Sequence, residues 1–226
     1  MKLLAIETST EACSAALLLG NEIQSRYEIA PQQHANLILP MVNELLAQTG
    51  IKLQQLDAIA FGRGPGSFTG VRIAASVTQG LAFGADVPVI PVSTLAAIAQ
   101  HMYREQQKIK VLAAIDARIS EVYWAAYELD NNNLMQLTGE ECVIAPDSVA
   151  VPEGKDWFGA GTGWSAYLPQ LQSRTKGHIT GYQGDAFPHA EDIIALASPL
   201  LASGQVLPPE QAIPVYLRDN VAIKKA

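Results

Sequence analysis

The sequence is short of charge, and of basic charge in particular. Only 16% of its 226 residues are charged, and 15 Lys and Arg stand against 22 Asp and Glu, which gives a net charge of −7. A domain that holds nucleic acid by itself usually carries a basic face, because phosphate contacts supply much of the affinity. We therefore expect any nucleic acid in its function to be held mainly by a partner.

Cysteine and long apolar runs are also scarce. Cys13 and Cys142 form no CxxC pair, which disfavours a structural zinc site. Isolated thiols in a chain with 49% hydrophobic residues are typical of buried side chains in a reducing compartment. No stretch approaches the roughly 20 apolar residues of a membrane span, and Glu7 interrupts the opening apolar run. The sequence predicts a cytoplasmic protein without membrane contact.

The four histidines are too dispersed for a local metal site. His34, His101, His178 and His189 contain no pair closer than 11 positions (189 − 178), which excludes HxxxH and HExxH motifs. Ser67 follows a glycine, but it lacks the GxSxG spacing of a nucleophile elbow. We therefore expect no metal and no catalytic residues in this chain.

Hydrophobic periodicity predicts an α/β architecture. Residues 3–7, 13–19 and 22–30 are strand candidates joined by tight turns, which indicates an antiparallel meander. Helices and strands then alternate, which is typical of parallel pairing with right-handed crossovers. The further elements expected in this half are strands at 57–62 and 87–92 and helices at 36–49, 67–84 and 93–104.

The same order of elements restarts after residue 110. Strand candidates at 111–116 and 122–129 repeat the opening pattern, and a shift of 109 positions places Glu7 on Asp116, an acid at a strand end in both halves. A polar stretch, REQQK, precedes the restart. We therefore predict two related lobes, a partner-binding lobe of residues 1–106 and a second lobe of residues 107–226 whose end packs back on the first.

The helix predicted at 67–84 carries a stripe of small residues, Gly70, Ala74 and Thr78, which would let another helix approach closely. Together with the helix at 36–49 it offers more apolar residues than one sheet face would need, which favours contact with another protein. Packing inside its own domain is the alternative. The predicted partner-binding residues are Leu37, Ile38, Met41, Leu45, Phe68, Gly70, Val71, Ala74, Ala75 and Thr78.

Two strand-end turns and one glycine-rich loop are candidate nucleotide contacts. An acid at a strand end often only caps its turn, and neither turn contains the glycine that would let a phosphate approach the backbone. The loop GAGTG at 159–163 could cradle adenosine, and a plain turn is the alternative. The candidate nucleotide-binding residues are Glu7, Thr8, Ser9, Asp116, Arg118, Gly161 and Gly163.

Four segments together resemble the bacterial TsaB family, also called YeaZ. They are GPGSFTGVR at 64–72, IETS at 6–9, DAR with EVY at 116–123, and PVYLR at 214–218. The resemblance implies an actin-like ATPase fold (ASKHA, ribonuclease H-like), with two related lobes that each hold a mixed sheet flanked by helices.

The resemblance also implies a function. TsaB-like proteins act with a TsaD-like paralogue and a TsaE-like ATPase to transfer threonylcarbamoyl from threonylcarbamoyl-AMP to N6 of adenosine 37 in tRNA (t6A modification). TsaD-like subunits hold a metal through His-x-x-x-His, whereas residues 92–96 of this chain, VSTLA, contain no histidine. The resemblance therefore implies a non-catalytic scaffold subunit.

The family further implies how partners meet. Helices 36–49 and 67–84 would join their counterparts in a four-helix bundle, and a homodimer could use the same surface when the partner is absent. The tRNA would be reached only through the complex. No cofactor is expected in this chain itself, although ATP or ADP could lie at the partner interface. A stand-alone ATPase or peptidase of the glycoprotease class and a non-hydrolysing nucleotide-binding module are the alternatives.

Overall fold

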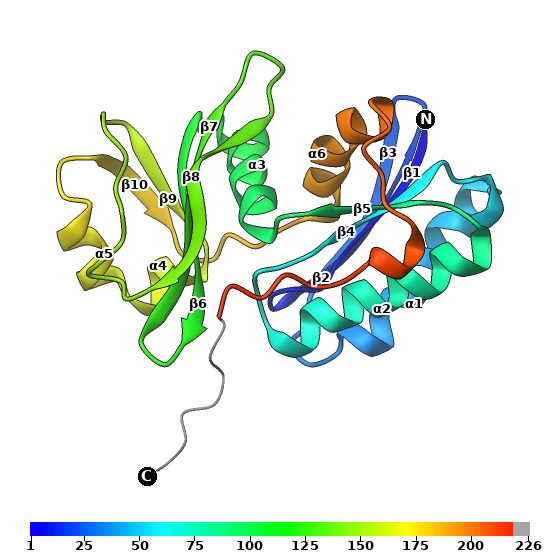
Figure 1. The fold of residues 1–226 in the computed structure, drawn as a ribbon, viewed down its shortest axis with the longest axis horizontal. Coiled ribbons are helices and arrows are strands. Elements are labelled where there is room, and N and C mark those ends of the chain that lie inside the picture. The colour runs from blue at the N-terminus through cyan, green and yellow to red at the C-terminus, as the bar shows by residue number, and fades with distance from the viewer. Residues whose placement is uncertain (219–226) are drawn as a thin grey trace, which may run out of the picture.

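The computed structural model describes residues 1–218, which form two lobes, each built on a five-stranded sheet (Figure 1). The first sheet contains β1 (Lys2–Glu7), β2 (Ala12–Leu19), β3 (Glu22–Ile29), β4 (Ala58–Gly62) and β5 (Val89–Val92). The second contains β6 (Lys110–Arg118), β7 (Glu121–Leu129), β8 (Met135–Ile144), β9 (Trp157–Ala160) and β10 (Ile179–Gln183).

The two sheets have the same topology. The strand order is β3-β2-β1-β4-β5 in the first sheet and β8-β7-β6-β9-β10 in the second. In both, the first three strands pair antiparallel as a meander and the last two join in parallel. β1 and β6 are the central strands, so Glu7 and Asp116 stand near corresponding strand ends. The predicted pair of related mixed sheets is confirmed.

Helices cover both faces of each sheet. They are α1 (His34–Thr49), α2 (Phe68–Ala85), α3 (Thr94–Gln106), α4 (Thr162–Ala166), α5 (Leu168–Arg174) and α6 (Ala190–Ala202), with short 3₁₀ helices at Leu53–Gln55 and Pro209–Gln211. α1 and α2 cover the outer face of the first sheet, and α4 and α5 lie on the outer face of the second (Figure 1). None of the helices within residues 1–218 is long and apolar enough to cross a membrane.

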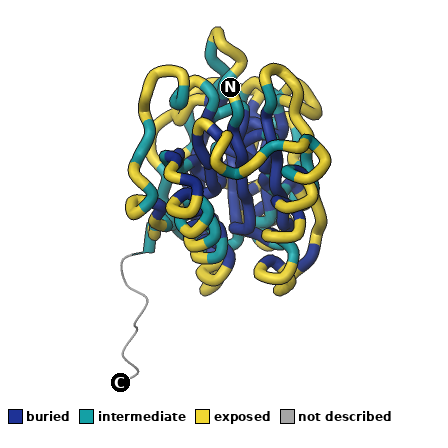
Figure 2. Tube along the Cα trace, turned by 90° about the vertical axis from the view of Figure 1, so that its right-hand side faces the viewer, coloured by how far each residue is buried: buried dark blue, intermediate teal, exposed yellow. Residues whose placement is uncertain are grey.

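Local signals set the helix boundaries close to the predicted ones. The Ser67 hydroxyl accepts a hydrogen bond from the Gly70 N–H at 3.4 Å, and the Ser93 hydroxyl accepts one from Ala96 at 3.3 Å. Gly50 ends α1 with a left-handed backbone, as a C-terminal glycine does. The central strands of each sheet are buried, whereas the edge strands β3 and β8 and the outward turns of the helices are largely exposed (Figure 2).

The hydrophobic cores do not divide at residue 106. Leu95 and Met102 of α3 precede that boundary, yet they pack in the core of the second sheet. Ile193 and Ile194 of α6 come late in the chain and pack on the first sheet. α3 and α6 also pack against each other between the lobes (Figure 1). The periodicity of a helix shows that it has a buried face, but not which sheet that face covers.

Candidate functional site

The GPGSFTG segment folds onto the turn that joins β1 and β2. The Ser67 N–H donates to the carbonyl of Ser9 at 2.7 Å, and the Thr8 hydroxyl donates to the carbonyl of Gly70 at 2.7 Å. A Cβ atom would lie 2.4 Å from the Ser9 oxygen at Gly66 and 2.1 Å from the Thr8 oxygen at Gly70. Glycine is required here because two backbone segments touch, and the contact leaves no space for a phosphate between them.

Glu7 closes this arrangement from inside the lobe. Its side chain is fully buried and accepts a hydrogen bond from the Ser9 N–H, while Oε2 has no partner within residues 1–218. Burial raises the pKa of Glu7 to about 7, against the opposing effect of hydrogen bonds from Ser9 and Thr8. The chain itself encloses Glu7, Thr8 and Ser9, so the geometry offers no open surface for the nucleotide contact predicted at these residues.

The corresponding turn of the second lobe is open. Asp116 Oδ1 accepts from the Arg118 N–H at 2.8 Å and from the Tyr167 hydroxyl at 3.1 Å. Asp116 Oδ2 pairs with the Arg118 guanidinium at 2.8 Å, although the Arg118 side chain is 78% exposed. Asp116 therefore holds its own turn together, as the alternative for a strand-end acid predicted.

Packing also explains the glycines of the GAGTG loop. A Cβ atom at Gly161 would lie 2.3 Å from the backbone oxygen of Ala114, and one at Gly163 would lie 2.8 Å from the Ala114 Cβ. The loop leads into α4, which has only five residues. The geometry supports a plain turn pressed against β6, and the predicted nucleotide cradle at Gly161 and Gly163 has no support in it.

The buried cysteine, Cys13, lies in an environment that suppresses its reactivity. Cys13 is buried 3.9 Å from the sulfur of Met41, and burial, followed by the charges of Glu7 and Glu28, raises its thiol pKa to about 12. Such a thiol is not a nucleophile near neutral pH. Within residues 1–218 no three His, Cys, Asp or Glu side chains gather to hold a metal ion.

Most of the predicted partner-binding residues face the interior of the first lobe. Their small and apolar side chains meet the outer face of the first sheet, so the alternative of packing within the domain is correct for them. The buried members are Ile38, Met41, Leu45, Gly70, Val71, Ala74, Ala75 and Thr78. Leu37 is half-buried, and Phe68 is 55% exposed. Small residues are needed because α2 lies close to the sheet and to the Thr8 backbone.

The opposite side of the same two helices, α1 and α2, is exposed. The sequence analysis did not identify it as a candidate surface. Along α2, Ser76, Gly80 and Gly84 repeat at every fourth position, and no atom of residues 1–218 lies within 4 Å of a Cβ atom built at either glycine. Large apolar side chains are exposed on the same two helices, with Phe83 of α2 59% and Leu39 of α1 42% exposed. We call Leu39, Phe68, Ser76, Gly80, Phe83 and Gly84 the outer face.

The segment of residues 213–218 ties the two lobes together. The Val215 N–H donates to the Arg63 carbonyl at 2.8 Å, and Arg218 donates to the Ala117 carbonyl at 3.1 Å. Beside it, Arg63 of the first lobe pairs with Glu141 of the second at 3.1 Å. These contacts span the gap between the lobes on the side of the GPGSFTG turn.

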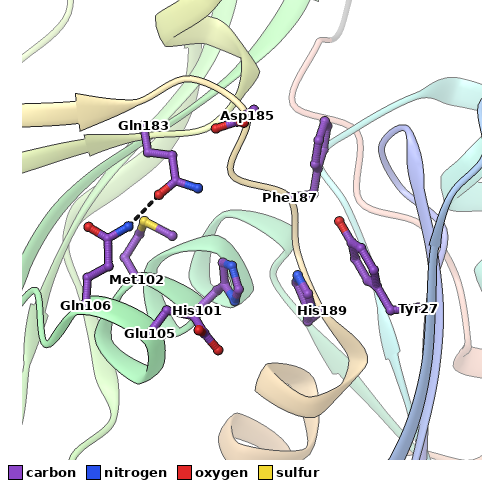
Figure 3. Close-up of a pocket in the computed structure, with 9 residues that line it drawn as sticks. All are labelled: Tyr27, His101, Met102, Glu105, Gln106, Gln183, Asp185, Phe187 and His189. Atoms are coloured by element: carbon purple, nitrogen blue, oxygen red, sulfur yellow. Dashed lines mark hydrogen bonds between the residues drawn. The ribbon is translucent and has the colours of Figure 1, made fainter.

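An open cavity of about 450 Å³ lies where the chain crosses between the lobes, and no motif of the sequence analysis pointed to it (Figure 3). Three rings stack along it, with His189 4.0 Å from Tyr27 and 4.1 Å from His101, measured between ring centroids. The two histidines are far apart in the sequence, so only the tertiary fold could reveal their contact.

These features define the class of protein. Two related lobes, each a three-stranded meander followed by α/β units, make the actin-like, ribonuclease H-like fold. In this example the turn after β1 is filled by the chain's own GPGSFTG segment.

The chain belongs to the TsaB (YeaZ) family. It is 44% identical to the tRNA threonylcarbamoyladenosine biosynthesis protein TsaB of Escherichia coli K12, over 100% of this chain and 98% of that protein. The Haemophilus influenzae protein of the same name is 41% identical, over 100% and 97%. Residues 18–226 match the family model described as TsaD, tRNA N6-adenosine threonylcarbamoyltransferase.

Solved structures agree with this assignment. YeaZ from Pseudomonas aeruginosa is 51% identical and superposes with a TM-score of 0.90, over 96% of this chain and 99% of that one. Another structure with the same values is described as an uncharacterized Pseudomonas aeruginosa protein with similarity to peptidase YEAZ. The expected fold class is confirmed.

Proposed function

We propose that this chain is a non-catalytic scaffold subunit in the formation of threonylcarbamoyladenosine (t6A) in tRNA. The names of its relatives support a role in t6A formation. The match to a transferase family model supports common ancestry with that transferase. The scaffold role is supported by a filled turn after β1 together with an exposed surface on the helices beside it. The GPGSFTG segment occupies the turn after β1, while the outer face of the neighbouring helices is exposed.

The partners follow from this assignment. A TsaD-like transferase would dock on the scaffold and supply the catalytic groups, and a TsaE-like ATPase would join the complex. The tRNA would be held by these partners, in keeping with the net charge of −7. A homodimer would use the same surface in the absence of the transferase. Any ATP or ADP would lie at the interface between subunits.

The outer face is the docking surface of this proposal, in place of the buried stripe. Side chains are small at Ser76 and absent at Gly80 and Gly84, so a partner helix could lie close to the backbone of α2 there. The exposed side chains of Phe83 and Leu39 offer the large apolar anchors that stable interfaces need. A specific interface would bury roughly 1,200–2,000 Å² in total, which two helices can supply.

The substitution Gly80→Arg tests this surface. A Cβ atom at Gly80 meets no atom of the described residues within 4 Å, and arginine is a good helix former, so the variant should fold normally. In the complex the same side chain would separate the helices. We expect binding to the TsaD-like transferase, measured by calorimetry, to weaken by about 100-fold or more.

A matched control is Gln172→Arg, which adds the same side chain to an exposed position of α5. It should bind the transferase as the unmodified chain does. Equal affinity for Gly80→Arg and the unmodified chain would exclude the outer face as the docking surface.

The peptidase named for one relative is the competing function. It would require a nucleophile and a base in this chain. Cys13 is enclosed with a pKa of about 12, and Ser67 uses its hydroxyl to cap α2. The peptidase function would be favoured if the highly purified chain cleaved peptides and kept this activity through successive chromatography columns.

A further inference from the structure

An arginine near the start of α2 is held in place by two aromatic rings. The Cζ atom of Arg72 lies 3.6 Å from the centre of the Phe68 ring and 5.8 Å from that of Tyr216. Its Nε donates a hydrogen bond to the Tyr216 hydroxyl at 2.9 Å. Aromatic faces attract a guanidinium through the ring quadrupole, so both contacts fix the side chain. We call Phe68, Arg72 and Tyr216 the arginine stack.

The arginine stack joins the start of α2 to residues 213–218, which are far away in the sequence. Further along the helix, the side chain of Gln79 donates to the Pro209 carbonyl at 3.3 Å. The chain from Pro209 to Tyr216 therefore follows α2 (Figure 1). Ile213 lies within this stretch and is exposed. The segment thus widens the exposed surface beside α2.

Arg72 also continues the outer face. Phe68, Arg72, Ser76, Gly80 and Gly84 are all exposed and follow one another at intervals of four residues. Residues four apart are neighbours on a helix surface, so the five form a continuous exposed row. Arg72 is the single charged residue in the 18 residues of α2. The proposed docking surface therefore carries one cation, near one end of an uncharged row.

The charge of Arg72 is not neutralised within residues 1–218. Its two terminal nitrogens donate to no atom of these residues, and no carboxylate of them lies within 4 Å. A guanidinium that is already fixed loses less side-chain entropy when an anion binds. Other arginines of the chain do pair with a carboxylate, namely Arg26, Arg63, Arg104, Arg118 and Arg218.

We propose that the arginine stack binds the carboxylate of an Asp or Glu side chain of the TsaD-like transferase. This inference rests on the proposed function and names a contact within its docking surface. The planar fork of a guanidinium matches the two oxygens of a carboxylate. Arginine and tyrosine are also enriched among the residues that carry binding energy at interfaces. The exposed Phe68 and Ile213 would shield the ion pair from water.

An RNA phosphate is the other anion that would suit a guanidinium. Binding to a phosphate backbone depends on several cations that act together. Neither α1 nor α2 contains a Lys or Arg other than Arg72, and the chain has a net charge of −7. A single cation in an apolar surface therefore favours a single carboxylate of a protein partner.

Calorimetry of the whole chain with the TsaD-like transferase tests the contact. Arg72→Gln should weaken binding by about 10-fold, because the partner's carboxylate loses its counter-ion. Glutamine is a good helix former, and the position is exposed, so the variant should fold normally. Added salt should weaken the unmodified complex more than the variant complex, because salt screens the ion pair.

A matched control is Arg174→Gln, which removes the same charge from an exposed position of α5. The Nε of Arg174 donates to a backbone carbonyl, and no carboxylate of residues 1–218 pairs with this side chain. The control should bind the transferase as the unmodified chain does. Equal weakening by both glutamine variants would overturn the proposal, because it would reflect net charge alone.

The Gly80→Arg variant separates this contact from the docking surface as a whole. If Gly80→Arg blocks docking while Arg72→Gln binds as tightly as the unmodified chain, the arginine contact is overturned and the surface stands. If neither variant changes binding, the docking surface itself is overturned. Unchanged transferase binding by Arg72→Gln, with weaker binding of tRNA to the assembled complex, would assign the guanidinium to a phosphate and also overturn the proposal.

Discussion

The carboxyl group of Glu7 is buried in the first lobe, and its Oε2 has no hydrogen-bond partner among residues 1–218. Its pKa rises from 4.5 to about 7 on folding, mainly through burial. Because the folded-state pKa is the higher one, the favourable protonated form is fully present below pH 4.5. The stability it provides is lost as the pH rises through about 7.

We therefore expect Glu7→Gln to become relatively more stable as the pH rises. The amide cannot ionise, and it keeps an oxygen that can accept from the Ser9 N–H. Between pH 4.5 and pH 8 the free energy of unfolding of the variant should gain on that of the unmodified chain by about 3 kcal/mol, as an order of magnitude. Urea unfolding at several pH values measures it, with the exposed Glu153→Gln as a control that should show no such trend.

Glycines of the same chain should respond to alanine in opposite directions. Gly66→Ala places a Cβ against the Ser9 backbone, and we expect it to lower the free energy of unfolding by about 1–3 kcal/mol. Gly80→Ala meets only solvent on a helix, and it should raise that free energy by about 1 kcal/mol. Chemical denaturation compares the two, and equal effects would contradict the packing assigned to the GPGSFTG turn.

For single residues, the sequence could identify unusual positions, but it could not show which other residues they contact. The glycines at 64, 66 and 70 identified a special turn, and only the fold showed that they admit the Thr8 and Ser9 backbone in place of a phosphate. His101 and His189 carry no local signal, because their stacking depends on where α3 and α6 meet.

Among the elements, α2 shows where prediction from the sequence succeeded and failed. The Ser67 cap and the apolar period located the helix closely. The small-residue stripe was assigned to a partner, yet it faces the sheet, because a meander and parallel strands built from Leu4, Ile6 and Phe61 offer a wide apolar face. The exposed stripe contains serine and glycine, which hydrophobic periodicity does not detect.

The two faces of α2 should therefore tolerate charge differently. Ala74→Glu buries a carboxylate in the core, and we expect the variant to be unfolded or to lose several kcal/mol of stability. Phe83→Asp lies on the outer face and should change the free energy of unfolding by less than about 0.5 kcal/mol, while weakening self-association. Thermal unfolding and analytical ultracentrifugation distinguish them. A stable Ala74→Glu variant would contradict the assignment of Ala74 to the core of the first lobe.

For the whole molecule, the duplicated sheets could be predicted, but their connection could not. The repeat of strand, acid, turn and strand is visible in the sequence and is borne out by identical strand orders. α3 packs on the second sheet and α6 packs on the first. The two sheets offer similar apolar faces, so the local sequence of a helix does not show which sheet it covers. The Arg63–Glu141 pair and residues 213–218 add further links between the lobes. The proposed scaffold role would benefit from such links, because a more rigid molecule loses less entropy on docking.

The most direct test is the rate of threonylcarbamoyl transfer to tRNA in a mixture of the TsaD-like transferase, the TsaE-like ATPase and this chain. We predict that Glu7→Gln combined with Asp116→Asn, in a folded chain, supports the same rate as the unmodified protein. Gly80→Arg should lower that rate by about 100-fold at limiting concentration, because docking fails. Full activity with Gly80→Arg, or loss of transfer by the acid variants while the complex still forms, would contradict the scaffold role.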